Sequence, residues 1–205
     1  MKNETPDPIV EKFIRFCESD FGKRVMDLEA AYLRKELSGC EKILDIGCGI
    51  GSIEERLPAL DITGLETGEM IEEARRRSDK AFIRGNAYTM PFPDSSFDGA
   101  FFLTTLEFLD DYQLAIVEAA RILKRDGKMV IMMLNQESEY FKAHFQKPDD
   151  YFRNIKYTSY DRIEEHASRF FELKSEYFLG ISGTKVSEEG DRTSAALFVL
   201  KGRKR

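Results

Sequence analysis

The chain contains few of the residues that most often bind metals or form disulfides. Its 205 residues include only three cysteines, Cys17, Cys40 and Cys48, and two histidines, His144 and His166. Three cysteines cannot all pair with one another, and no CxxC spacing suggests a zinc site. Two histidines are too few for a histidine-rich metal centre. The sequence therefore predicts no metal site.

Long apolar runs and an excess of basic residues are also missing. No stretch approaches the ~20 apolar residues that a membrane-spanning helix needs. The first residues, MKNETPDPIVEKF, lack the apolar centre of a signal peptide. We therefore expect no membrane span and a cytoplasmic location. The net charge of -6 disfavours nucleic acid as a partner, because nucleic-acid-binding proteins usually present a basic face.

What the chain does contain is an alternation of apolar strands and amphipathic helices. Helices are expected at residues 8–37, 52–57, 68–77, 110–124 and 159–170. Strands are expected at residues 41–47, 61–66, 81–86, 97–103, 127–134, 171–180 and 193–203. This order predicts an α/β fold, a Rossmann-like open sheet of seven strands with helices on both faces. The sheet should be mostly parallel with an antiparallel last strand.

A length of 205 residues suits one domain, which we divide into four parts. Residues 1–39 form a helical cap, broken within the stretch SDFG because Gly22 is unfavourable inside a helix. Residues 40–134 form the strand–helix core. Residues 135–158 are an aromatic-rich insertion, and residues 159–205 contribute the closing helix and strands.

A glycine-rich loop follows the first expected strand, with Gly47, Gly49 and Gly51 at alternate positions. In open α/β sheets ligands bind beyond the carboxyl ends of the strands, and glycine lets them approach the main chain. A dinucleotide, a phosphate and an adenosine-bearing methyl donor could each use such a loop. The dinucleotide fingerprint needs glycine or alanine where this chain has Ser52, and no Gly-Lys-Ser/Thr follows for a phosphate loop. Neither of these two alternatives fits well.

The stretch LDIGCGIG resembles motif I of the class I S-adenosylmethionine-dependent methyltransferases. Glu66 lies 21 residues after Asp45, where that family carries the acidic residue for the ribose hydroxyls. GNAYTMPFPDSSFDGAF and ARILKRDGKMVIM resemble the later motifs, so the resemblance covers roughly residues 40–135. It is strongest to the methyltransferase type 11 branch typified by ubiquinone-biosynthesis enzymes. The resemblance implies S-adenosylmethionine as donor and S-adenosylhomocysteine as product, with residues 40–134 as the donor-binding core.

The resemblance also implies roles for individual residues. Glu66 would accept hydrogen bonds from the ribose, and Asp45 would hold the amino group of the methionine part or brace the loop. Asn86, where the family more often has aspartate, would accept from the adenine amino group. Met70 would contact the adenine face or pack in the core, and Cys48 would be a small buried residue. The expected donor-binding residues are Asp45, Gly47, Cys48, Gly49, Gly51, Glu66, Thr67, Met70, Asn86, Ala87, Tyr88, Leu103 and Thr104.

The sequence gives fewer indications of the residues that bind the methyl acceptor than of those that bind the donor. Methyl transfer from a sulfonium depends chiefly on holding acceptor and methyl group in line, and it needs a general base only if the acceptor must lose a proton. Glu107 could be that base or bind a cationic acceptor, or it could be a surface residue on a short helical turn. His144 is the other candidate base. Aromatic residues of the insertion should cover the acceptor pocket or pack on the sheet; they are Tyr140, Phe141, Phe145, Tyr151, Phe152 and Tyr157.

The sequence thus predicts a methyltransferase that acts on a small molecule. Two alternatives stay open. The chain could methylate a protein or RNA, or it could be a donor-binding regulatory or partner subunit without its own acceptor chemistry. A nicotinamide-dependent oxidoreductase is disfavoured by Ser52. The sequence predicts neither the identity of the acceptor nor the oligomeric state.

Overall fold

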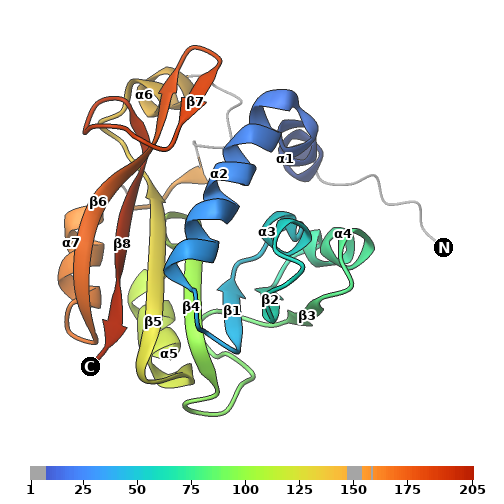
Figure 1. The fold of residues 1–205 in the computed structure, drawn as a ribbon, viewed down its shortest axis with the longest axis vertical. Helices are drawn as coiled ribbons and strands as arrows, with labels where there is room; N and C mark the ends of the chain where they lie inside the picture. Colours follow the sequence, from blue (N-terminus) through green and yellow to red (C-terminus); the bar gives the residue numbers. More distant parts are fainter. Residues whose placement is uncertain (1–7, 147–153, 158) are drawn as a thin grey trace.

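The computed structural model describes residues 8–146, 154–157 and 159–205, and within these ranges one sheet of eight strands runs through the molecule. The strands are β1 (Ile43–Ile46), β2 (Ile62–Glu66), β3 (Ala81–Arg84), β4 (Phe97–Leu103), β5 (Leu123–Leu134), β6 (Phe171–Ser182), β7 (Lys185–Ser187) and β8 (Ala195–Lys204). Their order across the sheet is β3-β2-β1-β4-β5-β8-β6-β7 (Figure 1). The first five strands pair in parallel, and β8 is antiparallel to both of its neighbours. The predicted Rossmann-like α/β sheet is therefore confirmed.

The predicted number of seven strands is wrong by one. β7 forms between the two expected closing strands, in a segment where no strand was expected. It pairs antiparallel with the end of β6, where Ile181 lies opposite Val186. Because β7 has three residues and only Val186 among them is partly buried, it shows no hydrophobic alternation that the sequence could reveal.

Helices cover both faces of the sheet (Figure 1). They are α1 (Pro8–Glu18), α2 (Asp20–Glu36), α3 (Ser52–Arg56), α4 (Met70–Arg77), α5 (Tyr112–Ile122), α6 (Glu139–Phe145) and α7 (Tyr160–Ala167), with a 3₁₀ turn η1 (Leu106–Phe108). None of the helices in the described ranges is long and apolar enough to cross a bilayer.

The strands bury alternate residues on the two faces, which decides where polar side chains of the site point. In β4, Phe101 joins the apolar cluster under α2, whereas Phe102 joins the cluster under α5 and α7. In β1, Ile43 faces α2, and Leu44 and Ile46 face the opposite side. Since strand side chains alternate, Asp45 points to the face covered by α2 and α3.

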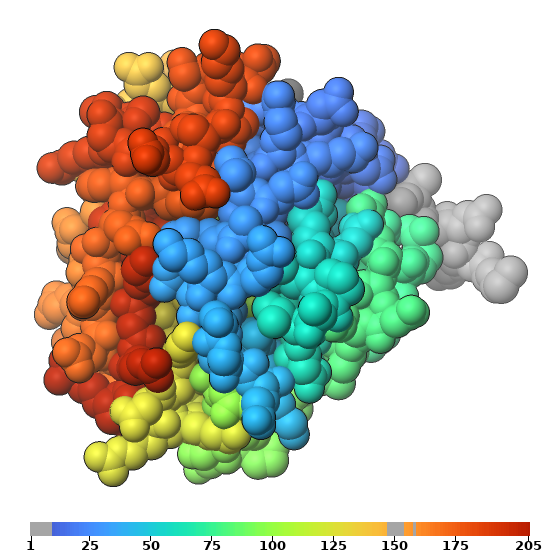
Figure 2. Space-filling view, viewed as in Figure 1, coloured from blue at the N-terminus to red at the C-terminus, as the bar shows by residue number. Residues whose placement is uncertain are grey.

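The break between the first two helices is shorter than predicted. Only Ser19 separates α1 from α2, and Gly22 is the third residue of α2. The Ser19 hydroxyl oxygen caps α2 by accepting a hydrogen bond from the Gly22 N–H at 3.0 Å. A Cβ atom on Gly22 would lie 1.9 Å from the carbonyl oxygen of Phe16, so glycine here permits close packing of the two helices. Figure 2 shows these helices, in blue, between the C-terminal strands and α3 and α4.

Candidate functional site

A cavity of about 930 Å³ opens at the carboxyl ends of β1, β2 and β4. This volume is in the range of small-molecule binding sites. The structure brings twelve of the thirteen expected donor-binding residues to its wall, namely Asp45, Gly47, Cys48, Gly49, Glu66, Thr67, Met70, Asn86, Ala87, Tyr88, Leu103 and Thr104. Gly51 does not line the cavity. It precedes α3 with φ of 72°, and a Cβ atom there would lie 3.1 Å from the Ala74 Cβ of α4.

The glycine loop has a backbone that side chains would disturb. Gly47 and Gly49 have φ values of 83° and 55°, in the left-handed region that favours glycine. A Cβ atom on Gly47 would lie 2.4 Å from the Thr105 side chain. The Gly47 N–H donates to the carbonyl of Leu65 at 2.8 Å, which ties the loop to β2. No side chain of Gly47 or Gly49 therefore covers the main chain of the loop at the cavity, which is the property for which the sequence analysis proposed glycine at these positions.

Glu66 connects the glycine loop to the turn after β2. One carboxylate oxygen accepts from the Gly49 N–H at 3.1 Å. The other accepts from the Thr67 N–H at 2.7 Å and from the Gly68 N–H at 3.0 Å. The carboxylate is thereby held in a fixed position on the cavity wall. The oxygen that accepts from Thr67 and Gly68 also accepts from the Thr67 hydroxyl at 3.3 Å, whereas Oε2 accepts only from Gly49 among the described residues. Oε2 therefore keeps a lone pair for a ligand hydroxyl.

The segment after β3 forms the next part of the wall. The Asn86 side-chain oxygen accepts from the Tyr88 N–H at 2.8 Å, so the oxygen expected to face adenine already accepts one hydrogen bond. The Tyr88 hydroxyl accepts from the Asp110 N–H at 2.7 Å and thus links this segment to the loop after β4. Met70 borders the same cavity, and its sulfur lies 3.8 Å from the position of a Cβ on Gly49. Met70 is therefore a wall residue that also packs on the loop.

Two buried carboxyl groups lie side by side behind the loop. Asp45 is 2% exposed, and Glu54 of α3 is fully buried. Among the described residues, Asp45 Oδ1 and both carboxyl oxygens of Glu54 have no hydrogen-bond partner of standard geometry. Burial raises the pKa of Asp45 well above its ordinary value, and the neighbouring Glu54 raises it further. Burial also raises the pKa of Glu54, to about 7.

The two candidate bases lie in different environments. The expectation that Glu107 is a surface residue is wrong, because it is only 3% exposed, although it does lie on the short helical turn η1. Its Oε1 accepts from the Leu134 N–H at 2.9 Å, and burial raises its pKa to about 7. Glu107 is not among the residues that line the cavity, whereas His144 is. The His144 Nδ1 lies 2.9 Å from the carbonyl oxygen of Tyr140.

The aromatic residues of the insertion divide between cavity and core. Tyr140 lines the cavity and packs against the His144 ring at 4.3 Å between centroids. Phe141 is buried and stacks on Phe145, and Tyr157 packs on Tyr112, so these three aromatic residues of the insertion pack against the core instead of lining the cavity. Tyr151 and Phe152 lie outside the described residues.

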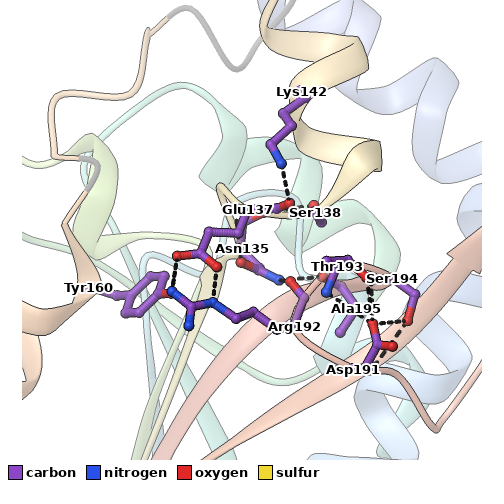
Figure 3. A network of polar contacts seen from close by, with 10 residues as sticks. All are labelled: Asn135, Glu137, Ser138, Lys142, Tyr160, Asp191, Arg192, Thr193, Ser194 and Ala195. Atoms are coloured by element: carbon purple, nitrogen blue, oxygen red, sulfur yellow. Dashed lines mark hydrogen bonds and ion pairs between the residues drawn. The ribbon is translucent and has the colours of Figure 1, made fainter.

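A polar network fixes the segment that carries Tyr140 and His144 (Figure 3). Asn135 is fully buried and its side-chain amide donates to the carbonyls of Arg192 and Ala195, each at 2.8 Å. Glu137 forms an ion pair with Arg192 from the loop before β8. The Ser138 hydroxyl oxygen caps α6 by accepting from the Phe141 N–H at 3.0 Å. The end of β5 and the start of α6 are therefore tied to β8.

The cap supplies cavity residues that the sequence analysis did not identify. They come from one side of α1 and α2 and are Lys12, Phe13, Phe16, Cys17, Val25, Met26 and Glu29. The helical period predicted a cap over one edge of the sheet, but it could not indicate which helix face meets the cavity. The ends of β5, β6 and β8 add an apolar region with Leu134, Leu179, Ala196 and Leu197.

Comparison with known proteins supports the interpretation of these features. Residues 44–131 match the family model described as a methyltransferase domain. The chain is similar to demethylmenaquinone methyltransferase of Thermotoga maritima, with 37% identity over 100 residues that cover 46% of this chain and 44% of that protein. It is also similar to an O-methyltransferase of Aspergillus nomiae, with 31% identity over 44% of this chain and 45% of that protein. The chain thus spans about half the length of these curated relatives.

The similarity to solved structures extends further along the chain. A S-adenosylmethionine-dependent methyltransferase of Thermotoga maritima, described as a possible histamine N-methyltransferase, has a TM-score of 0.79 and 26% identity, and the match covers 96% of both chains. It includes the cap, the sheet and the closing strands. The family model, the relatives and this structure agree with the glycine loop and with the cavity at the carboxyl ends of the strands. Residues 44–131 therefore match a methyltransferase domain, and the sheet and the cavity are those of the class I S-adenosylmethionine-dependent methyltransferase fold.

Proposed function

We propose that this protein transfers the methyl group of S-adenosylmethionine to a small-molecule acceptor. The observation that carries the proposal is the position of Glu66. Its carboxylate is fixed between the glycine loop and the turn after β2, on the wall of a cavity of about 930 Å³. A carboxylate in this place suits vicinal ribose hydroxyls, which donate charge-assisted hydrogen bonds.

The other residues of the cavity fit the rest of such a donor. Gly47 and Gly49 leave the main chain accessible to its methionine part, and Asp45 supplies a carboxyl group for the amino nitrogen. Asn86 and Tyr88 offer polar groups for the adenine ring beside the apolar side chain of Met70. The donor, when bound, supplies an electrophilic methyl group on a positively charged sulfur. The residues of the chain position that methyl group and exclude water from it.

The limited volume of the cavity and the helices that enclose it favour a small molecule as the methyl acceptor. Helices α1 and α2 and the α6 segment line it together with the strand ends, so the space beyond the donor residues is bounded on several sides. Two of the compared proteins are named for small molecules, demethylmenaquinone and histamine. The net charge of -6 disfavours a nucleic-acid acceptor.

Thermal unfolding in the presence of candidate ligands tests the proposal. We expect S-adenosylmethionine and S-adenosylhomocysteine each to raise the melting temperature, because a ligand at a hundred times its dissociation constant adds about 2.7 kcal/mol of stability. NAD at the same concentration should have no effect. Stabilisation by NAD alone would contradict the proposal. Donor binding without methyl transfer to any small molecule would instead favour a donor-binding subunit.

A further inference from the structure

The cavity wall contains a buried carboxyl group for which the donor residues provide no role. Glu29 lies in the middle of α2 and is 7% exposed. It lines the cavity beside Val25 and Met26, which occupy the same side of the helix. No hydrogen bond or ion pair to its carboxyl group exists among the residues that the structure describes. The Glu29 oxygens are not sealed in the core but open on the cavity, so a ligand group that enters the cavity can pair with them.

Arg56, the cation whose charge acts on Glu29, does not pair with its carboxyl group. Arg56 of α3 bonds through its Nε to Asp27 at 2.8 Å and through its Nη1 to the Ser52 carbonyl at 2.9 Å. It acts on Glu29 only through its charge. Burial raises the pKa of Glu29 to about 8, and Arg56 opposes this shift without cancelling it. The carboxyl group is thus close to its titration point near neutral pH.

The surroundings of Glu29 place it apart from the adenosine side of the cavity. Glu66 is the last residue of β2, and Asn86 and Tyr88 follow β3, at one end of the sheet. Val25, one turn from Glu29 on α2, belongs instead to the apolar cluster of Leu134 and Leu197, at the ends of β5 and β8. Met26, on the same side of α2, packs with Cys17 and with Ile50 of the glycine loop. Glu29 therefore lies between the glycine loop and this apolar region, away from the residues that face the nucleoside.

The charges on the wall select among possible acceptors. Four acidic residues line the cavity, Glu29, Asp45, Glu66 and Asp110, and the basic residues in its described lining are Lys12 and His144. An ammonium group held beside Glu29 would favour the carboxylate form of that residue and be attracted to it, whereas an anionic acceptor such as a phenolate or a carboxylate would meet Glu66 and Asp110 with repulsion. A protonated amine is also the acceptor that must lose a proton before its nitrogen can attack a methyl group.

We propose that Glu29 binds the amino group of the acceptor and takes the proton that its nitrogen must lose, so that the acceptor is a small amine with an apolar body. This inference rests on the proposed methyl transfer. The ammonium group of the acceptor gives one proton to the Glu29 carboxylate and becomes a neutral amine. The nitrogen lone pair then forms the bond to the methyl carbon while the sulfur–carbon bond breaks and its electron pair stays on sulfur. The products are a methylated ammonium ion, the neutral thioether and a protonated Glu29, which returns its proton to water.

The test compares charged and uncharged probes of the same shape. S-adenosylhomocysteine is first titrated into the protein to show that the donor site is filled. Benzylamine, phenethylamine and phenylpropylamine are then titrated calorimetrically into this complex, followed by the three alcohols of the same chain length. The variants are Glu29→Gln and, as a matched control, Asp27→Asn. Asp27 lies two residues away on the same helix and also neighbours Arg56, but its side chain is 65% exposed and outside the cavity wall.

We expect at least one amine to bind the wild-type complex more tightly than its alcohol. Glu29→Gln should weaken that amine by about tenfold or more, as expected for loss of a charged hydrogen-bond partner, and leave the alcohol and S-adenosylhomocysteine unchanged. Asp27→Asn should behave like the wild type. The inference is overturned if no amine exceeds its alcohol, or if Glu29→Gln binds the amine as tightly as the wild type. Failure of S-adenosylhomocysteine to bind would instead overturn the proposed function on which the inference rests.

Discussion

At the scale of single residues, four acidic side chains are buried in the described part of the chain, and two of them, Asp45 and Glu29, line the cavity. Asp45, Glu54 and Glu107 have exposed fractions of 3% or less, and Glu29 has 7%. Asp45 could be predicted as a site residue from its place in the glycine motif. Glu29 and Glu54 could not, because a glutamate in a charged helix is most often solvent-exposed. Their burial depends on which helix face packs on the sheet, and that is decided by contacts between distant segments.

Glu107 provides a prediction about stability and pH. Its pKa of about 7 lies above the value of about 4.3 for an unfolded glutamate. The proton therefore stabilises the fold fully at pH values below the unfolded pKa, and this stabilisation is lost as the pH rises through about 7. In Glu107→Gln the side-chain oxygen can still accept from the Leu134 N–H, but the group no longer titrates. We expect the variant to lose less unfolding free energy than the wild type between about pH 5 and about pH 8, by on the order of 2 kcal/mol.

Urea unfolding at a series of pH values measures this difference. S-adenosylhomocysteine affinity serves as the control, because Glu107 does not line the cavity and its substitution should leave that affinity unchanged. Equal pH dependence of stability in the two proteins would show that Glu107 does not titrate in the folded state.

At the scale of secondary-structure elements, the sequence predicted those strands and loops whose formation depends on short-range patterns of apolar residues and glycines. The strands from β1 to β5 and the glycine loop followed from apolar runs and from glycine spacing, and they lie where they were expected except at the start of β5. That strand begins at Leu123, within the stretch predicted as the end of a helix. Strand β7 has too few residues for such a pattern, and it forms because the chain turns back on β6. The cap was predicted as two helices, but Gly22 was assigned to the break because a helix interior disfavours glycine, whereas contact with α1 requires it.

Substitution of Gly22 tests that contact. Gly22→Ala would favour helix by intrinsic propensity, by about 1 kcal/mol. However, its Cβ would lie 1.9 Å from the Phe16 carbonyl oxygen, which is main chain and cannot rotate away. We therefore expect a net loss of stability of roughly 1–3 kcal/mol, in the range of other overpacked sites, and a lower melting temperature. Lys23→Ala, at the exposed neighbouring position, should change the melting temperature little. A stabilised Gly22→Ala protein would contradict the close packing of α1 on α2.

At the scale of the whole molecule, the cap, the parallel strands and the closing strands enclose one cavity from different sides. The core supplies the predicted donor residues, while α1, α2 and the ends of β5, β6 and β8 supply the part of the wall that the sequence did not reveal. The chain spans about half the length of its curated relatives, and its matches to them cover a similar share of the chain. More than half of the chain therefore lies outside the match to each of these two relatives, so the relatives do not identify the residues that bind the methyl acceptor.

The central claim is that a nucleoside binds with its ribose on Glu66, and calorimetric titration of S-adenosylhomocysteine tests it most directly. The wild type and Glu66→Ala are compared, with Glu55→Ala, an exposed position on α3, as the control. We expect Glu66→Ala to weaken binding by on the order of 2 kcal/mol, or roughly 30-fold, and Glu55→Ala to bind like the wild type. Equal affinity of the wild type and a folded Glu66→Ala protein would contradict the claim.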